Sequence, residues 1–213
     1  MSHFPYLDQL KRYRFESGLV ALGIPLSVTN LREAYSKGIF PWPHGEEERL
    51  WFFPEERGII DFSCFRIPRR LQQFRRKCGL DFTLNCSFSE VIKACAEVPR
   101  RGQSGTWIGP GVIKAYIALH EAGLAHSIEC WRQGKLLGGI YGVCINGYFS
   151  AESMFGFESN ISKLCLVELI EHLSSRGFKW LDIQMVTAVT KSFGGVYISS
   201  LDFLALLERA RLD

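Results

Sequence analysis

An aspartate and a glutamine stand out as polar groups inside an otherwise apolar segment near the C-terminus. Residues 178–185 read Phe-Lys-Trp-Leu-Asp-Ile-Gln-Met, which predicts a β-strand. Because side chains alternate along a strand, Asp182 and Gln184 share one face with Trp180. A carboxylate and an amide placed there cost free energy unless they are hydrogen-bonded or used in chemistry. The pair is therefore either a structural feature of a strand end or a catalytic site.

A second carboxylate, Glu152, lies in the mainly apolar sequence 148–155. This sequence predicts another strand, on which Ser150, Glu152 and Met154 share one face. A carboxylate beside Met154 either neutralises a cationic group of a substrate or is an ordinary surface residue. Spacing alone leaves both interpretations open.

A run of positive charge follows Pro68. Residues 66–77 carry six cationic side chains and no acidic one. Apolar residues at helical spacing (Leu71, Phe74 and Cys78) predict a helix whose charges lie mostly on the solvated side. Such a face is either simply solvated or contacts the phosphates of a nucleic acid. The cations that we expect to make phosphate contacts are Arg69, Arg70, Arg75, Arg76 and Lys77.

Composition sets limits on the kind of protein. The 213 residues are 47% hydrophobic and 22% charged, which excludes general disorder. A formal net charge of +3 is too small to indicate a nucleic-acid partner by itself. Seven cysteines, none at C-x-x-C spacing, indicate free thiols rather than disulfides or zinc ligands, and the histidines form no metal constellation. Without a signal peptide or a membrane span, the expected location is the cytoplasm.

The elements that must position these groups are clearest after residue 61. Asn146-Gly147 predicts a tight hairpin turn, because both residues tolerate positive φ. Before it, a helix capped by Ser87 and running to Cys95 is expected. Two or more helices beside an antiparallel meander indicate a mixed α/β domain. The expected strands are 80–84, 125–131, 136–145, 148–155 and 178–185, and the other expected helices are 111–121 and 161–175.

The first sixty residues have a different character. They are rich in Gly, Pro and aromatic residues, and they predict one clear helix, capped by Asn30 with Glu33 at the capping-box position and ended by Gly38. We interpret them as a small appended domain or lid.

Several short blocks follow one another in a recognisable order between about residues 15 and 205. They are 18–21, 34–42, 51–57, 105–108, 115–120, 125–131, 138–143, 152–155, 162–163 and 182–184. Each block alone is weak, but together they resemble the leucyl/phenylalanyl-tRNA–protein transferase family.

The resemblance implies an α/β (α+β) fold with a small N-terminal domain, residues 1–60, packed on an acetyltransferase-like (GNAT) catalytic domain, residues 61–213. It also implies a reaction that moves Leu or Phe, less often Met, from aminoacyl-tRNA to the N-terminal Arg or Lys of acceptor proteins, which marks them for degradation. The donor is an activated ester, so no ATP, metal or other cofactor is expected. We also expect a monomer that does not bind membranes.

The resemblance assigns roles to the polar residues. Asp182 and Gln184 are implied to be the catalytic pair, and Glu152 to shape the acceptor pocket. Gln184 either accepts a hydrogen bond from the attacking amine or donates one to the oxyanion, and the sequence leaves both open. Trp51 and Trp107 are implied to contact the terminal adenosine of the tRNA. For the donor side chain we expect a pocket of Ile140, Met154, Phe155 and Leu166.

Departures from the family pattern leave other functions open. Ile183 stands where the family usually has Cys, Val189-Thr190 replaces a His-Leu pair, and Ser200 replaces an Arg. One alternative is an acetyl-CoA-dependent N-acetyltransferase of the same fold, although residues 157–161 are acidic and lack the pyrophosphate-binding loop. The other is a non-enzymatic RNA-binding module, which leaves the polar strand residues unexplained.

Overall fold

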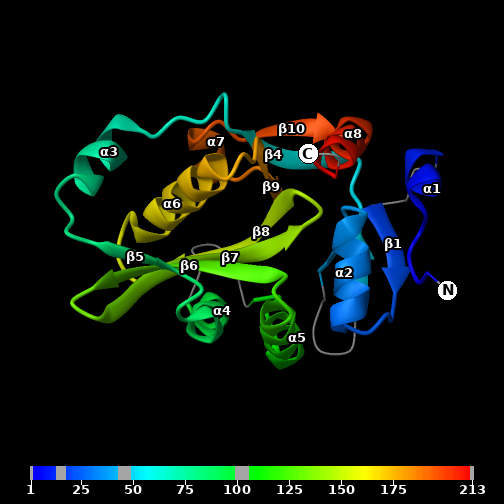
Figure 1. Ribbon diagram of the computed structural model, residues 1–213, viewed down its shortest axis with the longest axis horizontal. Helices are drawn as coiled ribbons and strands as arrows, with labels where there is room; N and C mark the ends of the chain where they lie inside the picture. The colour runs from blue at the N-terminus through cyan, green and yellow to red at the C-terminus, as the bar shows by residue number, and fades with distance from the viewer. Residues whose placement is uncertain (1, 13–17, 43–48, 99–105, 212–213) are drawn as a thin grey trace.

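A seven-stranded sheet carries helices on both faces (Figure 1). The computed structural model describes residues 2–12, 18–42, 49–98 and 106–211. All neighbouring strands are antiparallel except β8 and β9, which are parallel. The predicted mixed α/β class with a mixed, largely antiparallel sheet is therefore confirmed. In sheet order the strands are β10 (Val196–Ser199), β4 (Glu56–Asp61), β9 (Trp180–Gln184), β8 (Tyr148–Gly156), β7 (Lys135–Ile145), β6 (Ala125–Arg132) and β5 (Asp81–Leu84).

Two hydrophobic clusters fill the space between this sheet and its helices. The first lies beneath the long helix α6 (Ile161–Ser175) and includes side chains from α3 (Arg69–Arg75) and β9. The second lies on the opposite face, against α4 (Phe88–Glu97), α5 (Pro110–Glu121) and α8 (Ser200–Ala210). A short helix, α7 (Ala188–Ser192), follows β9. We call these two groups of side chains the α6 cluster and the α5 cluster.

A smaller three-stranded sheet lies beside the α5 cluster. It consists of β1 (Leu19–Leu22), β3 (Leu50–Phe52) and β2 (Phe40–Pro41), and the helices α1 (Leu7–Arg12) and α2 (Val28–Ser36) accompany it. Strand β4 follows directly and joins the large sheet between β9 and β10. The division into two domains at residue 60 stays a prediction.

The antiparallel meander of β6, β7 and β8 has the tight turn that Asn146-Gly147 predicted. Asn146 and Gly147 both have positive φ, 46° and 77°, and Ile145 pairs with Tyr148. Strands β6 to β8 and helices α4 to α6 lie within a few residues of the expected ranges. The predicted start of α2 is wrong, because Ser27 is its N-cap and the Asn30 side chain instead donates to the carbonyl of Pro25.

A β-bulge in β8 changes the predicted facing of Glu152. Tyr141 pairs with Ser153, whereas the next residue of β7, Gly142, pairs with Ala151, so Glu152 is an extra residue in β8. An inserted residue reverses the alternation of side chains beyond it. Glu152 therefore contacts Tyr116 of the α5 cluster, while Met154 packs in the α6 cluster. The expectation that these two side chains share one face is wrong.

Candidate active site

Asp182 is the anchor of a buried polar chain in the centre of the large sheet. Its side chain is fully buried, and both carboxylate oxygens accept hydrogen bonds from Arg57 of β4, from Nε at 2.8 Å and from Nη2 at 2.7 Å. Burial alone would lower the pKa of this guanidinium, but Asp182 beside it raises that pKa above its usual value. The result is a fixed, bidentate ion pair.

Ser150 joins Asp182 to Gln184. Because β8 and β9 run parallel with Ser150 beside Asp182, the serine hydroxyl can donate to Asp182 Oδ2 at 2.9 Å. The amide nitrogen of Gln184 lies 2.7 Å from the same serine oxygen and 3.1 Å from Glu152 Oε1. The polar groups of three strands, β4, β8 and β9, thus form one connected network.

The backbone turns sharply at the end of β9 and aims Gln184 into this network. Gln184 has a positive φ of 51°, and its N–H donates to Asp182 Oδ1 at 3.0 Å. A non-glycine residue in the left-handed region carries strain that its surroundings must offset. Gly58 of β4 allows the turn to approach closely, since a Cβ there would lie 2.9 Å from the carbonyl carbon of Met185.

The hydrogen-bond network determines how the Gln184 amide is oriented. The Ser150 hydroxyl oxygen lies 2.9 Å from Asp182 Oδ2 and 3.4 Å from Glu152 Oε1. Its single hydrogen goes to the nearer carboxylate, so the oxygen is left to accept from Gln184. The Ser150 oxygen and the ionised Glu152 carboxylate are then both acceptors facing Gln184, which presents its NH2 group to them. Within the described part of the chain, Gln184 Oε1 receives no hydrogen bond. This oxygen is the group that an external N–H donor can reach.

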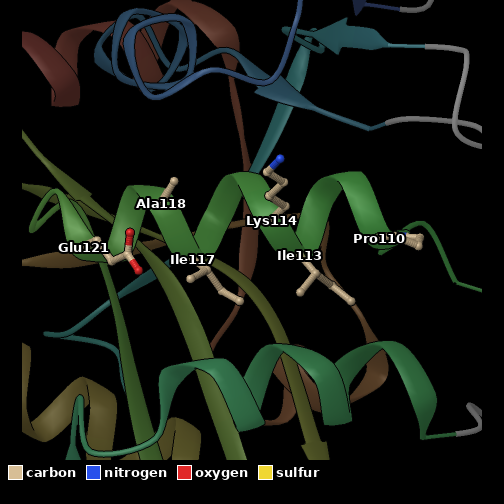
Figure 2. A pocket seen from close by; sticks show the side chains of 6 residues that line it. All are labelled: Pro110, Ile113, Lys114, Ile117, Ala118 and Glu121. Carbon is tan, nitrogen blue, oxygen red and sulfur yellow. The ribbon is translucent and has the colours of Figure 1, made fainter.

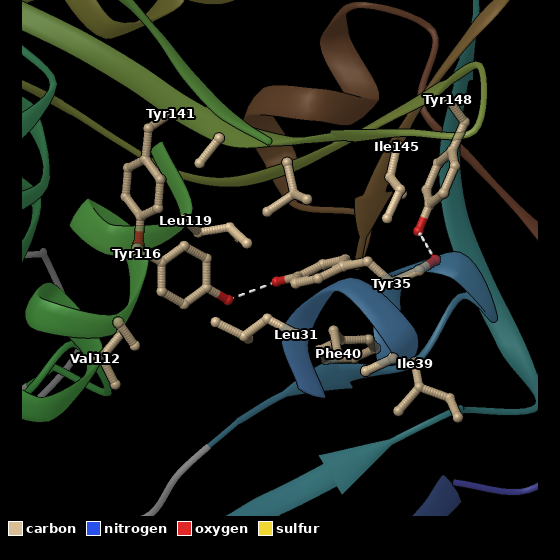
Figure 3. Packing of buried hydrophobic residues seen from close by; sticks show 14 of the residues in the cluster. Leu31, Tyr35, Ile39, Phe40, Val112, Tyr116, Leu119, Tyr141, Ile145 and Tyr148 are labelled. Carbon is tan, nitrogen blue, oxygen red and sulfur yellow. Dashed lines mark hydrogen bonds between the residues drawn. The ribbon is translucent and has the colours of Figure 1, made fainter. Parts of the chain in front are cut away.

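Glu152 is the titratable member of the network. It is half-buried, and its other oxygen accepts from the Tyr116 hydroxyl at 3.4 Å. Burial raises the pKa of the Glu152 carboxyl to about 7; the hydroxyl of Tyr35 opposes this rise and the charge of Asp182 adds to it. Figure 3 shows the Tyr35 hydroxyl pointing toward Tyr116, at 2.5 Å, and Tyr148 donating to the Tyr35 carbonyl.

The hydroxyl groups of Tyr35 and Tyr116 are uncharged neighbours of Glu152. Burial raises the pKa of both Tyr35 and Tyr116 well above the usual value. They therefore donate hydrogen bonds at physiological pH without adding charge. The hydrogen-bond donors of Glu152 are thus neutral, and the nearby guanidinium of Arg57 is already paired with Asp182, which leaves the Glu152 carboxylate to meet another cation.

The residues expected to form the donor pocket fall into two groups. Ile140 pairs with Met154 across β7 and β8, and both pack with Leu166 of α6 in the α6 cluster. Phe155 lies in the α5 cluster, on the other side of the sheet, and packs edge-on against Phe157. The structure therefore brings three of the four side chains together.

The two tryptophans expected at the adenosine differ in accessibility. Trp51 of β3 is completely buried and donates from its indole N–H to the carbonyl of Ile24. Trp107 is half-buried and packs edge-on against Tyr116, whose hydroxyl donates to Glu152. A third tryptophan, Trp42, is half-buried at the end of β2.

The predicted basic helix is α3, and its cations are not equivalent. Arg75 is half-buried and donates to the carboxylates of Glu168 and Glu171 on α6, which raise its pKa. The remaining cations of the helix and its C-terminal end are exposed. We call them the basic face of α3, namely Arg69, Arg70, Arg76 and Lys77.

A second buried carboxylate and a surface pocket lie outside the polar network. Glu129 is buried, but it accepts from two hydroxyls and a backbone N–H within β5, β6 and their neighbouring loop. A hollow of about 510 Å³ along α5 is mostly apolar, and in Figure 2 Ile113 and Ile117 point from α5 toward α4. None of its lining residues belongs to the polar network.

Metal ligands and membrane-spanning helices are two further features that bear on the kind of site. Over the ranges that the structure describes, no group of three or more His, Cys, Asp or Glu side chains could hold a metal ion. No helix there is long and apolar enough to cross a membrane. All seven cysteines are free thiols; Cys95, Cys130 and Cys165 are buried, and Cys64 and Cys86 are exposed.

Sequence reasoning missed the roles of Arg57 and Ser150 in the network, of the tyrosines beside Glu152, and of Gly58 at the turn. Arg57 is followed by the apolar sequence Gly-Ile-Ile, and a cation entering a buried strand requires a counter-ion. That signal existed, but it did not identify Asp182 as the partner, which lies 125 residues away in sequence.

Family comparisons give matches over most of the chain. The family described as "Leucyl/phenylalanyl-tRNA protein transferase" matches residues 59–208, and the one described as "Leucyl/phenylalanyl-tRNA protein transferase N-terminal domain" matches residues 25–55. A leucyl/phenylalanyl-tRNA–protein transferase of Lawsonia intracellularis is 43% identical over 205 residues, 96% of this chain and 88% of that protein. One of Pseudoalteromonas atlantica is 44% identical over 193 residues, 91% of this chain and 82% of that protein.

Similarity to solved structures is more distant. L-PGS from Bacillus licheniformis is 12% identical with a TM-score of 0.47, over 81% of this chain and 66% of that chain. A ribosomal-protein-alanine N-acetyltransferase from Brucella melitensis biovar Abortus 2308 is 14% identical with a TM-score of 0.38, over 54% of this chain and 87% of that chain. Acetyltransferases are among these structures.

Proposed function

This chain belongs to the leucyl/phenylalanyl-tRNA–protein transferase family, and we propose that it transfers Leu or Phe from aminoacyl-tRNA to the N-terminal amine of acceptor proteins. One observation supports this most directly: Gln184 is held with its carbonyl oxygen open beside Glu152, by a network that ends in a buried ion pair. An amine nucleophile and a cationic side chain are the groups that such a pair of acceptors fits.

The chemistry requires positioning more than strong acid–base catalysis. The ester of an aminoacyl-tRNA is already activated, and an α-amine has a pKa of about 7.7–8.0, so an appreciable fraction is the free base near neutral pH. Gln184 Oε1 accepts a hydrogen bond from this amine and directs its lone pair at the ester carbonyl carbon. The nitrogen–carbon bond forms, the ribose oxygen leaves, and the amine proton passes to that oxygen.

Asp182 and Glu152 have separate roles in this proposal. Asp182 is fully buried, and its oxygens receive four hydrogen bonds from Arg57, Ser150 and the Gln184 backbone. It therefore acts through Gln184 and does not contact substrate. Glu152 meets the side chain of an acceptor that begins with Arg or Lys, because bringing that cation into a half-buried site is costly without a carboxylate.

The donor is held by other surfaces. Ile140, Met154 and Leu166 form the apolar neighbourhood that suits a Leu or Phe side chain. Contact of Trp51 with the terminal adenosine stays a prediction, and the complete burial of its indole favours the half-buried Trp107 and Trp42 as stacking surfaces. The basic face of α3 is proposed to contact tRNA phosphates. The transferred Leu or Phe becomes the new N-terminus of the acceptor and marks it for degradation. The enzyme is proposed to act in the cytoplasm as a monomer.

The test is a transfer assay with labelled Leu-tRNA, Phe-tRNA and acetyl-CoA as donors and an Arg-starting peptide as acceptor. Transfer of Leu or Phe with no acetyl transfer is expected. Gln184→Ala should reduce the single-turnover rate by about 10²-fold or more. Acetyl transfer without aminoacyl transfer would support the acetyltransferase alternative instead. Normal rates in folded Gln184→Ala would exclude Gln184 from the reaction.

A further inference from the structure

Arg57 lies in β4, the first strand along the chain to enter the large sheet. Its side chain is 1% exposed and its guanidinium forms the bidentate pair with Asp182. The remaining nitrogen, Nη1, has no hydrogen-bond acceptor among the described residues. A cation buried so completely is rare unless it has a specific task.

Two aromatic rings complete the surroundings of this guanidinium. Phe40 of β2 lies 4.5 Å from it and Phe203 of α8 lies 4.6 Å from it, measured to the ring centroids. Both distances are typical of cation–π contacts. The small sheet and the C-terminal helix thus hold Arg57 on two sides, while Asp182 holds its edge.

The network transmits this fixed position to Gln184 by two routes. Asp182 Oδ1 accepts from Arg57 Nε and also from the Gln184 backbone N–H, which stabilises the left-handed turn. Asp182 Oδ2 accepts from Arg57 Nη2 and from Ser150, whose oxygen in turn accepts from the Gln184 amide. Backbone and side chain of Gln184 are therefore both set by a carboxylate that Arg57 orients.

We propose that Arg57 is a positioning residue of the transfer reaction, which acts through Asp182 to fix the Gln184 carbonyl where the acceptor amine attacks. This inference rests on the proposed function. Displacement of a reacting group by about 1 Å can cost about 10²-fold in rate. Lysine keeps the positive charge but cannot form the two-point contact, so it replaces Arg57 only in part.

The experiment is a double-mutant cycle with Arg57→Gln, Asp182→Asn and the double variant, in addition to Arg57→Lys. The control is Arg132→Gln, which breaks an exposed ion pair with Glu158. Values of kcat and of KM for Phe-tRNA and for an Arg-starting peptide are measured, together with thermal unfolding. We expect kcat to fall about 10²-fold in Arg57→Gln and less in Arg57→Lys, with both KM values close to wild type.

The double-mutant cycle distinguishes an effect of Arg57 on the position of Gln184 from an effect on the stability of the fold. If Arg57 acts through Asp182, adding Arg57→Gln to Asp182→Asn should lower kcat little further. Each single variant leaves one buried charge unpaired, whereas the double variant and Arg57→Lys do not. If a single variant fails to fold, the kcat of Arg57→Lys relative to wild type still tests the proposal. Fully additive losses, or a folded Arg57→Lys with wild-type kcat, would overturn the inference. Absence of transfer by wild type would instead overturn the proposed function.

Discussion

Glu152 gives the proposed acceptor site a pH dependence that can be measured. Burial raises the pKa of its carboxyl to about 7, while the acceptor side chain that it is proposed to meet stays positive throughout the neutral range. Only the ionised carboxylate attracts that cation. Selectivity for Arg-starting over Gln-starting acceptors should therefore rise as the pH rises through about 7, and Glu152→Gln should abolish the change.

The size of the effect follows from this pKa. With a pKa of about 7, roughly a tenth of Glu152 is ionised at about pH 6 and roughly nine-tenths at about pH 8. The ratio of kcat/KM for an Arg-starting peptide to that for a Gln-starting peptide should thus increase about tenfold over this range. Titration of the attacking α-amine is common to both peptides and cancels in the ratio.

The assay measures kcat/KM for both peptides across this range, in wild type and in Glu152→Gln, with saturating Phe-tRNA. Because kcat/KM reports ionisation of the free enzyme and free substrate, binding of the cation does not shift the inflection. In the variant the ratio should be low and constant. A constant ratio in wild type, or an inflection that persists in the variant, would refute the assignment of acceptor selectivity to Glu152.

The Glu152 carboxyl also predicts that the free energy of unfolding falls as the pH rises, whereas acceptor selectivity increases. A carboxyl whose pKa is raised by folding, here from 4.5 to about 7, favours the folded state when protonated. This contribution is complete below about pH 4.5 and is lost as the pH rises through about 7. The loss corresponds to roughly 3.5 kcal/mol, at about 1.4 kcal/mol for each unit of pKa. Urea unfolding of wild type against Glu152→Gln at several pH values measures it.

Two further predictions concern tRNA binding and the sheet. Replacing the basic face of α3 by glutamine should weaken binding of charged tRNA and flatten its salt dependence by up to about four contacts' worth of slope, whereas an unchanged slope would show a merely solvated face. Arg75→Gln should affect the slope less, because Arg75 already pairs with α6. Gly142→Ala should destabilise the protein by about 1–3 kcal/mol in urea unfolding, since a Cβ there would overlap the carbonyl oxygen of Ser150. Gly111→Ala, which meets no atom within 4 Å in α5, should be neutral or stabilising, and equal effects would contradict this reasoning.

The part of the fold that the sequence predicted is the part with local signals. Positive φ at Asn146-Gly147 fixed a hairpin register, and the range expected for α6 agrees with the observed helix. Strands β4 and β10 were not predicted, because each is short and pairs with elements distant in sequence. Their place in the sheet depends on the register of β9, which no local pattern encodes.

Within the site, alternation predicted one strand correctly and failed on the other. Trp180 and Asp182 do share a face of β9, with Leu181 in the opposite cluster. On β8 the same rule failed for Met154, because the bulge at Glu152 adds one residue that no composition signal marks. The neighbouring glycine, Gly142, is where the paired strand comes too close for a Cβ, and that closeness becomes apparent only when both strands are in place.

The two carboxylates of the network differ in what surrounds them, and this difference separates their functions. Asp182 receives a guanidinium on both oxygens and is completely buried, so its part in the proposed reaction is to hold a geometry. Glu152 receives only neutral donors, and its pKa of about 7 leaves it free to change charge when a cation approaches. Gln184 lies between the two carboxylates and is uncharged whether Glu152 is protonated or ionised. The orientation of its amide, set by Asp182 through Ser150, is therefore expected to survive the titration of Glu152, so that pH should alter which acceptor is chosen more than how fast a bound acceptor reacts.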